Sequence, residues 1–246
     1  MTPLARLLAG EWIPVGARRV VVLDGSVLIL GDAADILPQI PVGAFDAVVM
    51  DPPYGIGEAA GKNASRGKLA TAKDYGSDDW DNQPIPDDLM TLARSRGTWN
   101  IVFGGNYYRL PPSQCWLVWD KMNGRSDFAD CELAWTNMDK ATRMIRYMWN
   151  GMLRANNEPR GDHPTQKAVG VMKWAIEHLP DGSRTILDPF MGSGTTGVAA
   201  VTMGRKFVGI ERNEAYFNAA VRRLNIARQQ MDLFNDLPPT QEEITI

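Results

Sequence analysis

A proline-rigidified tetrapeptide, Asp51-Pro52-Pro53-Tyr54, carries the most specific chemistry in the sequence. Its two prolines fix the backbone and provide no N–H donor, so the Asp51 carboxylate and the Pro52 carbonyl form a rigid pair of acceptors beside a flat ring. An exocyclic amine of a nucleobase is a poor nucleophile because its lone pair is delocalised into the base. Two acceptors that each hold one N–H favour a pyramidal nitrogen and free that lone pair, while Tyr54 stacks on a base that has left its helix. The simpler interpretation is a proline-rich turn that only ends a strand.

A glycine-rich loop provides a second candidate site. Gly192, Gly194 and Gly197 form a GxGxxG pattern between an expected strand and an expected helix, with Phe190 beside it. Glycines there permit a tight turn and let backbone N–H groups approach a ligand closely. Glu211 ends the next expected strand, where a carboxylate can accept hydrogen bonds from ribose hydroxyls. The pattern predicts a site for an adenosine-containing cofactor. It does not by itself separate a dinucleotide from S-adenosylmethionine, and a structural glycine turn is the other interpretation.

Alternating strands and helices must position these two motifs. Apolar and β-branched runs predict strands at 18–23, 26–30, 45–50, 99–103, 115–119, 132–136, 185–187 and 206–210. Helices are expected at 33–37, 86–96, 166–178 with Thr165 as its cap, about 195–203, and 214–231 with Asn213 as its cap. This alternation predicts a mostly parallel sheet with helices on both faces. Both motifs then lie at the carboxyl ends of strands, where ligands bind in open α/β sheets.

Length and composition predict one α/β domain over residues 1–246, with 44% hydrophobic and 22% charged residues. No apolar run is long enough to cross a membrane, and residues 1–10 do not resemble a signal peptide, so we expect a cytoplasmic protein. Two cysteines and two histidines do not provide a common zinc-site spacing, so no metal is expected. The tail at about 232–246 is expected to be weakly ordered.

A net charge of −3 excludes a general basic footprint, so any contact with nucleic acid must be local. The polar, glycine-rich stretch at about 55–80 predicts a mobile loop that touches DNA phosphates through Lys62, Arg66, Lys68 and Lys73. A small target-recognition insertion is expected at about 121–162, where Arg143, Arg146 and Arg154 could read base edges. Solvated surface charge is the alternative for each cluster.

Four motifs in order resemble the amino-methylating DNA methyltransferases. The tetrapeptide comes first and the run 190–196 (FMGSGTT) comes near the carboxyl terminus, an order that resembles the β class of that family. The run 163–167 (HPTQK) resembles the family's segment that lies over the cofactor, and Gly31-Asp32 resembles its acid near the cofactor's adenine. The resemblance spans about residues 20–225 and is most similar to stand-alone methylases of phages and prophages rather than to long restriction-system enzymes.

The resemblance implies a Rossmann-like fold that uses S-adenosylmethionine, with permuted motif order. It implies that the tetrapeptide, Asp51, Pro52, Pro53 and Tyr54, holds the target base. The residues implied for the cofactor are Asp32, His163, Thr165, Lys167, Asp188, Phe190, Gly192, Gly194, Thr195 and Glu211. Ala168 stands where the family commonly has proline, which predicts a looser entry into the following helix.

The reaction that the resemblance implies is methyl transfer from S-adenosylmethionine to adenine N6 in double-stranded DNA, because an aspartate in the first tetrapeptide position favours adenine. Cytosine N4 is the nearest alternative, followed by an RNA or a protein side-chain amide. A catalytically silent DNA-binding protein is the non-enzyme alternative, which intact Asp51 and Tyr54 disfavour. Family members often form homodimers, so a dimer is a further expectation from the resemblance.

Overall fold

The computed structural model describes residues 2–55, 83–123, 129–150, 153–154, 167–235 and 241–245. The strands are β1 (Arg19–Leu23), β2 (Ser26–Leu30), β3 (Phe45–Met50), β4 (Gly97–Phe103), β5 (Trp116–Asp120), β6 (Cys131–Thr136), β7 (Arg143–Arg146), β8 (Trp149–Asn150), β9 (Leu153–Arg154), β10 (Thr185–Asp188), β11 (Lys206–Glu211) and β12 (Gln241–Thr245). The helices are α1 (Pro3–Leu8), α2 (Ala33–Ile36), α4 (Asp87–Ser95), α5 (Val169–Glu177), α6 (Thr195–Thr202) and α7 (Glu214–Asn235), with short 3-10 turns η1 (Leu37–Gln39) and η4 (Gly105–Tyr107).

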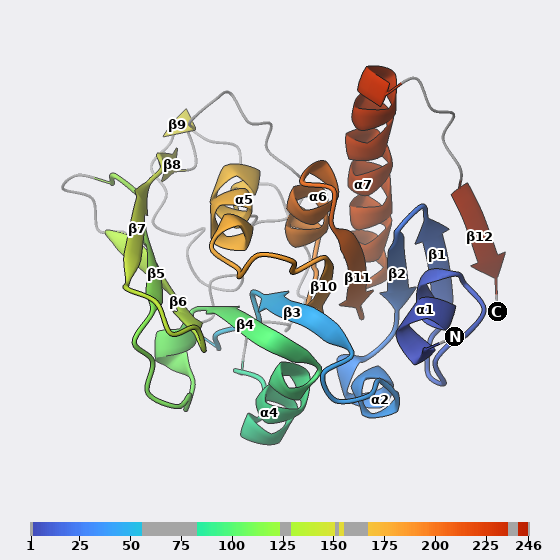
Figure 1. Cartoon of the computed structure of the whole chain (residues 1–246), viewed down its shortest axis with the longest axis horizontal. Coiled ribbons are helices and arrows are strands. Elements are labelled where there is room, and N and C mark those ends of the chain that lie inside the picture. Colours follow the sequence, from blue (N-terminus) through green and yellow to red (C-terminus); the bar gives the residue numbers. More distant parts are fainter. Residues whose placement is uncertain are drawn as a thin grey trace, which may run out of the picture.

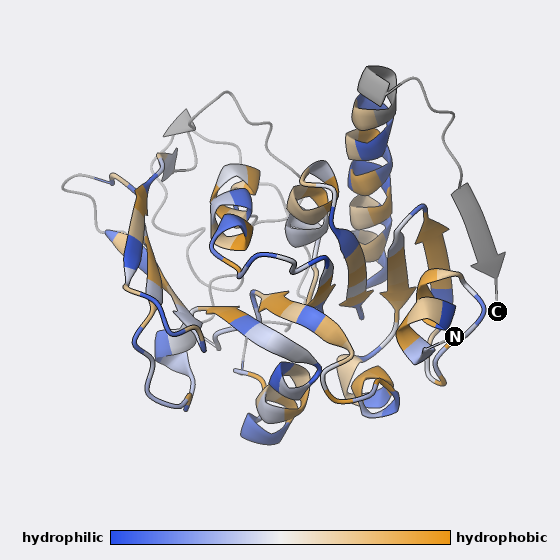
Figure 2. Ribbon diagram, viewed as in Figure 1, coloured by the Kyte–Doolittle hydropathy of each residue, from blue (hydrophilic) through white to orange (hydrophobic). Residues whose placement is uncertain are grey.

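One twisted sheet with helices on both faces forms the core (Figure 1). Its strand order is β12-β1-β2-β11-β10-β3-β4-β6-β5-β7, and the five strands from β2 to β4 pair in parallel. Helices α5, α6 and α7 cover one face and α1, α2 and α4 the other. Because both faces are covered, the central strands read as nearly continuous apolar runs, which Figure 2 shows as hydrophobic ribbons between amphipathic helices. The predicted Rossmann-like α/β fold is confirmed.

The strand order explains how two distant motifs meet. β10 comes late in the chain but lies between β11 and β3, with Ile186 beside Ala47 in register. The glycine loop after β10 and the tetrapeptide after β3 therefore emerge side by side at the carboxyl edge of the sheet. After β10 the chain continues to β11 on one side, whereas after β3 it continues to β4 on the other side. Such a reversal of strand order is a topological switch point, where α/β proteins bind ligands.

Two chain segments differ from the sequence-based expectations. Helix α5 begins at Val169 rather than at 166, and its N-cap is Ala168, which makes no side-chain capping bond, so the prediction of Thr165 as the cap is wrong. Ala168 is fully buried and has an extended backbone (φ −69°, ψ 133°), so helical geometry begins only at Val169. At the carboxyl terminus, where a weakly ordered tail was expected, α7 continues to Asn235 and β12 pairs antiparallel with β1.

Candidate active site

The tetrapeptide follows β3 directly and is held from the β4 side. Gly104, in the left-handed region at φ 64°, lies against the Tyr54 ring, and a Cβ there would be 2.1 Å from Tyr54 Cε1. The Tyr108 hydroxyl donates a hydrogen bond to the Pro53 carbonyl oxygen. Only glycine at position 104 leaves room for the Tyr54 ring, and Tyr108 holds the Pro53 carbonyl by a hydrogen bond.

Lys167 lies at the centre of the charged groups around Asp51. Its Nζ is 3.0 Å from Asp51 Oδ1, 2.7 Å from Glu132 Oε2 and 3.0 Å from the Tyr54 hydroxyl oxygen. The side chain is only 7% exposed, and Nζ also lies 5.4 Å from the Tyr54 ring centroid and 5.3 Å from that of Phe103. Three ammonium N–H groups thus meet three oxygen acceptors, which satisfies the buried cation completely.

Glu132 connects Lys167 to a second lysine, Lys121. Glu132 lies on β6, and its Oε1 forms an ion pair with Lys121 Nζ just after β5. Burial opposes the charge of Glu132, but Lys167 and Lys121 outweigh it and lower the pKa of Glu132 to about 2. Burial likewise opposes the charge of Lys167, and Asp51 and Glu132 raise its pKa above the ordinary value. Asp51, Lys167, Glu132 and Lys121, which we call the acid–lysine chain, therefore alternate in sign.

Only one oxygen of Asp51 is used within the protein. Oδ1 accepts hydrogen bonds from both the Tyr54 hydroxyl and Lys167, whereas Oδ2 accepts none from any residue that the structure describes. Burial raises the pKa of Asp51, an effect that Lys167 partly offsets. Burial, and then Asp51, raise the pKa of Tyr54 well above its usual value, so its hydroxyl stays protonated and donates. The Asp51 side chain keeps 26% exposure, so it is not fully enclosed.

The Tyr54 ring stacks on Tyr107, with ring centroids 5.0 Å apart and planes 18° from parallel. Tyr107 belongs to η4 and is 48% exposed. The backbone of Tyr54 also forms an isolated bridge with Pro84. The described residues on either side of 56–82 therefore meet beside Tyr54.

The glycine loop is closed by the acid that follows it in the sheet. Gly192 and Gly194 have φ values of 51° and 79°. Glu211 Oε2 accepts a hydrogen bond from the Gly192 N–H at 2.9 Å, and Oε1 accepts one from the Asn213 N–H at 2.7 Å. Burial raises the pKa of Glu211. Asn213 also caps α7 as expected, because its Oδ1 accepts from the Ala215 and Tyr216 N–H groups.

Asp188 and Thr195 support the loop from within the protein. Asp188 is 1% exposed and its Oδ1 accepts from the Phe190 N–H at 3.0 Å. Burial raises its pKa to about 7, even though a hydrogen bond from Thr196 favours the anion. Thr195 is 7% exposed, and its Oγ1 accepts from Arg223 Nη1, which also bonds Ser193. Asp188 and Thr195 therefore support the loop, as Glu211 does through Gly192.

Asp32 lies at the same edge, after β2. Its side chain is exposed and caps α2 by accepting from the Ala34 N–H at 2.9 Å. Phe190 and Gly192, which follow β10, are partly exposed. They lie next to Glu211, because β10 and β11 are neighbours in the sheet. The carboxyl edge thus combines accessible acids, an aromatic ring and a glycine turn.

For several predicted residues the structure gives no position, and two others lie at the end of the sheet. Lys62, Arg66, Lys68, Lys73, His163 and Thr165 lie outside the described residues, and of Arg154 only the backbone is described. Arg143 and Arg146 lie on β7 at the sheet's end, and both are exposed. Three positions apart on a strand, they point to opposite faces, and Arg146 Nε pairs with Asp120 Oδ2 at 3.2 Å.

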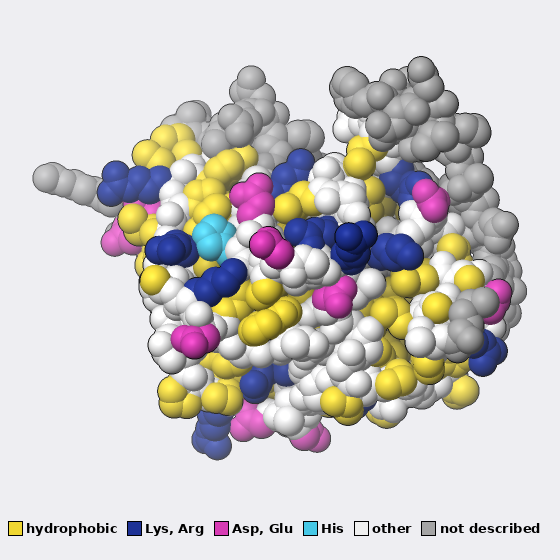
Figure 3. All heavy atoms as spheres, in the orientation of Figure 1, with side chains coloured by type: hydrophobic (Ala, Val, Ile, Leu, Met, Phe, Trp, Pro, Cys, Tyr) yellow, Lys and Arg dark blue, Asp and Glu magenta, His cyan; other side chains and the backbone are white. Residues whose placement is uncertain are grey.

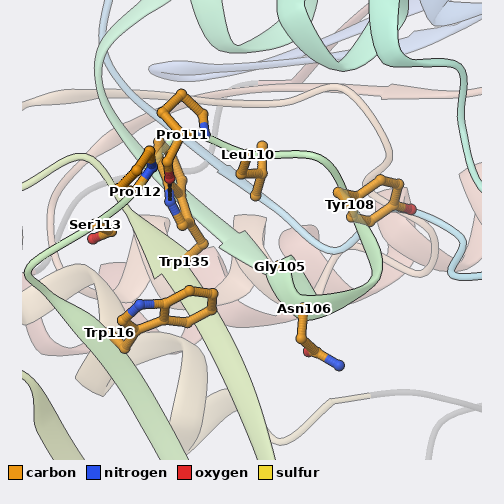
Figure 4. A pocket seen from close by; sticks show the side chains of 9 residues that line it. All are labelled: Gly105, Asn106, Tyr108, Leu110, Pro111, Pro112, Ser113, Trp116 and Trp135. Carbon is orange, nitrogen blue, oxygen red and sulfur yellow. Dashed lines mark hydrogen bonds between the residues drawn. The ribbon is translucent and has the colours of Figure 1, made fainter.

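A hollow of about 460 Å³ lies beside the tetrapeptide's support, lined by Gly105, Asn106, Tyr108, Leu110, Pro111, Pro112, Ser113, Trp116 and Trp135 (Figure 4). The Trp135 Nε1–H donates to the Pro111 carbonyl at 2.7 Å, and the Tyr108 hydroxyl points away from the hollow toward Pro53. Asn106 lies on this wall. The hollow is largely aromatic and proline-lined, and none of its lining residues belongs to the acid–lysine chain.

Sequence reasoning missed Glu132, Lys121 and Arg223 as parts of the site. The available signal for the first two was strand alternation. Glu132 on β6 lies directly opposite Trp119 on β5, and Lys121 follows the end of β5. For Arg223 the signal was a cation on the inner side of a helix that begins after Glu211. Each signal acquires meaning only from the tertiary pairing.

The surface and the fold add two observations. On the face drawn in Figure 3, Lys and Arg side chains form a band with Asp and Glu side chains among them rather than a field of one sign. Within the described ranges, no helix is long and apolar enough to cross a bilayer, and no group of three or more potential metal ligands gathers.

Comparison with known proteins relates this edge to one family. A family model described as DNA methylase, of the N6/N4 type, matches residues 106–222. The type II methyltransferase M2.LlaDCHI of Lactococcus lactis subsp. cremoris is 42% identical over 84 residues, which cover 34% of this chain and 31% of that protein. The DNA adenine methyltransferase YhdJ of Escherichia coli (strain K12) is 28% identical over 254 residues, which cover 83% of this chain and 84% of that protein.

Among solved structures, the PvuII DNA methyltransferase (cytosine-N4-specific) superposes with a TM-score of 0.50 at 18% identity, covering 85% of this chain and 91% of that one, a likeness of fold. The match to M2.LlaDCHI spans less than a third of that protein, whereas the match to YhdJ spans most of it. With the tetrapeptide and the glycine loop side by side at the switch point, the chain resembles the amino-methylating (N6/N4) DNA methylases, whose family model matches residues 106–222.

Proposed function

We propose that the protein methylates the exocyclic N6 of adenine in double-stranded DNA, with S-adenosylmethionine as the methyl donor. The observation that carries the proposal is that one oxygen of Asp51, Oδ2, has no hydrogen-bond donor among the described residues. Tyr54 and Lys167 bind Oδ1, whereas no described residue donates to Oδ2, which together with the Pro52 carbonyl would provide two acceptors. Such a pair of acceptors can hold both N–H groups of an amine that enters the site.

The tetrapeptide would then bind and orient the target base. Tyr54 offers a ring for stacking, which returns roughly 1–3 kcal/mol of the cost of extruding a base from the duplex. Asp51 Oδ2 accepts one amine N–H, and the nitrogen must lose one proton once it carries the methyl group. Because burial raises the pKa of Asp51, this carboxylate is a suitable proton acceptor.

The glycine-loop side fits a cationic adenosine cofactor better than a dinucleotide. Glu211 and Asp32 are carboxylates at the accessible edge, and Asp51 adds a third acid. Acids attract a cation and repel the phosphates of a dinucleotide. Arg223, the cation nearest the loop, contacts the loop's own Ser193 and Thr195. When bound, S-adenosylmethionine supplies an electrophilic methyl group on a sulfonium.

In this proposal Glu211 accepts hydrogen bonds from the ribose hydroxyls and Phe190 packs against the adenosine. Gly192 and Gly194 allow the backbone to approach it, while Asp32 lies on the neighbouring strand end. Asp188 and Thr195 act by holding the loop in shape. His163 and Thr165 keep the role that the resemblance implies, as residues that close over the cofactor.

Adenine is favoured over cytosine because of the aspartate at position 51 and because YhdJ is named an adenine methyltransferase. Cytosine N4 remains the second candidate, since the structure of similar fold is cytosine-N4-specific. The same two acceptors serve either amine.

DNA contacts are proposed for the segment 56–82, which follows the tetrapeptide in the sequence, through Lys62, Arg66, Lys68 and Lys73. Arg143, Arg146 and Arg154 are proposed as base readers. Since Arg143 and Arg146 point to opposite faces of β7, we expect only one of them to face a given groove. A homodimer is proposed from the family resemblance, and action on DNA favours a cytoplasmic location.

The test is incubation of the purified protein with isotopically labelled S-adenosylmethionine and, separately, double-stranded DNA, RNA and a protein mixture. Label in DNA that co-migrates with N6-methyladenine after digestion to nucleosides supports the proposal. Label in N4-methylcytosine instead would move the assignment to the second candidate. Label only in RNA or protein, or an Asp51→Ala variant as active as the wild type, would refute it.

A further inference from the structure

The acid–lysine chain contains two residues to which the proposed reaction assigns no role, Glu132 and Lys121. They come from β6 and the end of β5, strands that lie beyond β4 from the tetrapeptide. Glu132 is 20% exposed and holds a lysine on each carboxylate oxygen. Burying a carboxylate is costly unless it is paired, so this arrangement calls for an explanation.

The geometry at Lys167 supplies one. Its ammonium has three N–H groups, and they meet Asp51 Oδ1, Glu132 Oε2 and the Tyr54 hydroxyl. If the negative charge of Glu132 were lost, Asp51 would be the one anionic acceptor left among these three, and it carries a second oxygen beside the one already bound. Lys167 would then bind Asp51 through both oxygens and occupy the acceptor that the amine requires.

We propose that Glu132 is a positioning residue that restrains Lys167 to Oδ1 of Asp51, and that Lys121 adjusts the strength of this restraint from the outer end. The acid–lysine chain thereby keeps Oδ2 open for the amine and fixes how basic Asp51 is. This inference rests on the proposed function for its kinetic consequence only, because the state of Asp51 can be measured in the protein alone.

Coulomb's law gives the two outer residues opposite effects on Asp51. Removing the negative charge of Glu132 stabilises the Asp51 anion, because Glu132 raises the pKa of that carboxyl. Removing the positive charge of Lys121 leaves the Glu132 charge less compensated, so the Asp51 anion is disfavoured. A role confined to packing would not produce shifts of opposite sign.

The experiment compares Glu132→Gln and Lys121→Gln with the wild type, following the Asp51 side-chain carboxyl by NMR through a pH titration of isotope-labelled protein. The signal is identified by its loss in Asp51→Asn. We expect the midpoint to fall by roughly one pH unit in Glu132→Gln and to rise by a smaller amount in Lys121→Gln. Unchanged midpoints, or shifts of the same sign in both variants, would overturn the proposal.

The kinetic arm measures kcat and KM for DNA across the same pH range. Glu132→Gln should lower kcat roughly 10- to 100-fold, the loss that a misplacement of about 1 Å can cause, and move the acid limb of the profile to lower pH. Asp46→Asn is the matched control, because Asp46 is a partly buried acid at the opposite end of β3 that accepts hydrogen bonds from Thr185 and Arg184. It should lose stability while keeping the shape of the pH profile.

The two levels of the proposal fail separately. A wild type that methylates no DNA refutes the proposed function, while the Asp51 titration still tests the acid–lysine chain. A Glu132→Gln variant with wild-type kcat and an unmoved acid limb refutes the positioning role even if DNA is methylated. Should Glu132→Gln fail to fold, the upward shift expected in Lys121→Gln decides alone.

Discussion

Replacing Lys167 by methionine tests the buried cation at the centre of the acid–lysine chain. Methionine keeps most of the length and apolar surface of lysine. It removes the cation that lies between Asp51 and Glu132, so the two carboxylates would face each other without a cation between them. Removing one partner of a buried ion pair costs about 3–5 kcal/mol. For a chain of this length, 1 kcal/mol moves Tm by about 2–4 °C, so we expect Tm at pH 8 to fall by roughly 6–20 °C.

The pH dependence of this loss follows from Asp51. Burial and Glu132 both raise the pKa of Asp51 above 3.8, and without Lys167 less opposes them. A carboxyl whose folded pKa exceeds its unfolded pKa destabilises the fold fully above the folded pKa, and the penalty shrinks as pH falls toward the unfolded value. The deficit of Lys167→Met should therefore be largest at pH 8 and smaller near pH 5.

The assay is thermal and denaturant unfolding of Lys167→Met and the wild type at pH 5 and pH 8. Lys140→Met is the matched control, because Lys140 is exposed and donates only to the His178 carbonyl. Its effect should stay within about 0.5 kcal/mol at either pH. A Lys167→Met deficit below about 1 kcal/mol at pH 8, or one that does not shrink at pH 5, would refute the reasoning.

Three further predictions concern the base site, the cofactor edge and the loop support. Tyr54→Ala should raise KM for DNA roughly 5- to 150-fold, the loss of about 1–3 kcal/mol of stacking, while Tyr54→Phe should affect kcat more than KM because it keeps the ring and loses the hydroxyl that binds Asp51; equal effects of the two variants on KM would contradict this. Glu211→Gln should weaken S-adenosylmethionine binding roughly 10- to 100-fold in calorimetry, because a charge-assisted hydrogen bond is replaced by a neutral one; unchanged affinity would remove Glu211 from the cofactor site. Asp188 has a folded pKa of about 7 against an unfolded 3.8, so its burial penalty grows as pH rises between these values and reaches about 4 kcal/mol at most. Asp188→Asn should therefore gain stability relative to the wild type between pH 4 and pH 8 in paired unfolding curves, and a difference independent of pH would argue against a buried neutral acid.

Local sequence signals predicted the elements that carry their own pattern. The strands predicted at the apolar runs of β3 and β10 are confirmed, because strands buried on both faces must be continuously apolar. The edge strand β7 (RMIR) was not predicted as a strand, since it is largely exposed and carries charge at both ends. Thr165 satisfies the local rule for a helix cap, but buried Ala168 requires extended backbone until α5 begins.

The candidate site divides along the same line. The tetrapeptide and the glycine turn are stretches whose backbone properties can be read from four to seven consecutive residues. The pairing of Lys167 with Asp51 joins residues 116 positions apart and depends on α5 packing over the sheet between β4 and β10. The resemblance assigned Lys167 to the cofactor side, whereas in the structure its Nζ binds the oxygens of the tetrapeptide and of Glu132.

This placement gives Lys167 a structural consequence beyond its charge. It immediately precedes α5, and the chain runs from α5 into β10 and the glycine loop. Its three acceptors belong to β6 and to the tetrapeptide after β3. One buried ammonium thus connects the segment that leads into the cofactor loop with the acceptors that would hold the amine. Because methyl transfer needs the two reacting atoms in line, a fixed link between those halves restricts their relative movement where alignment matters most.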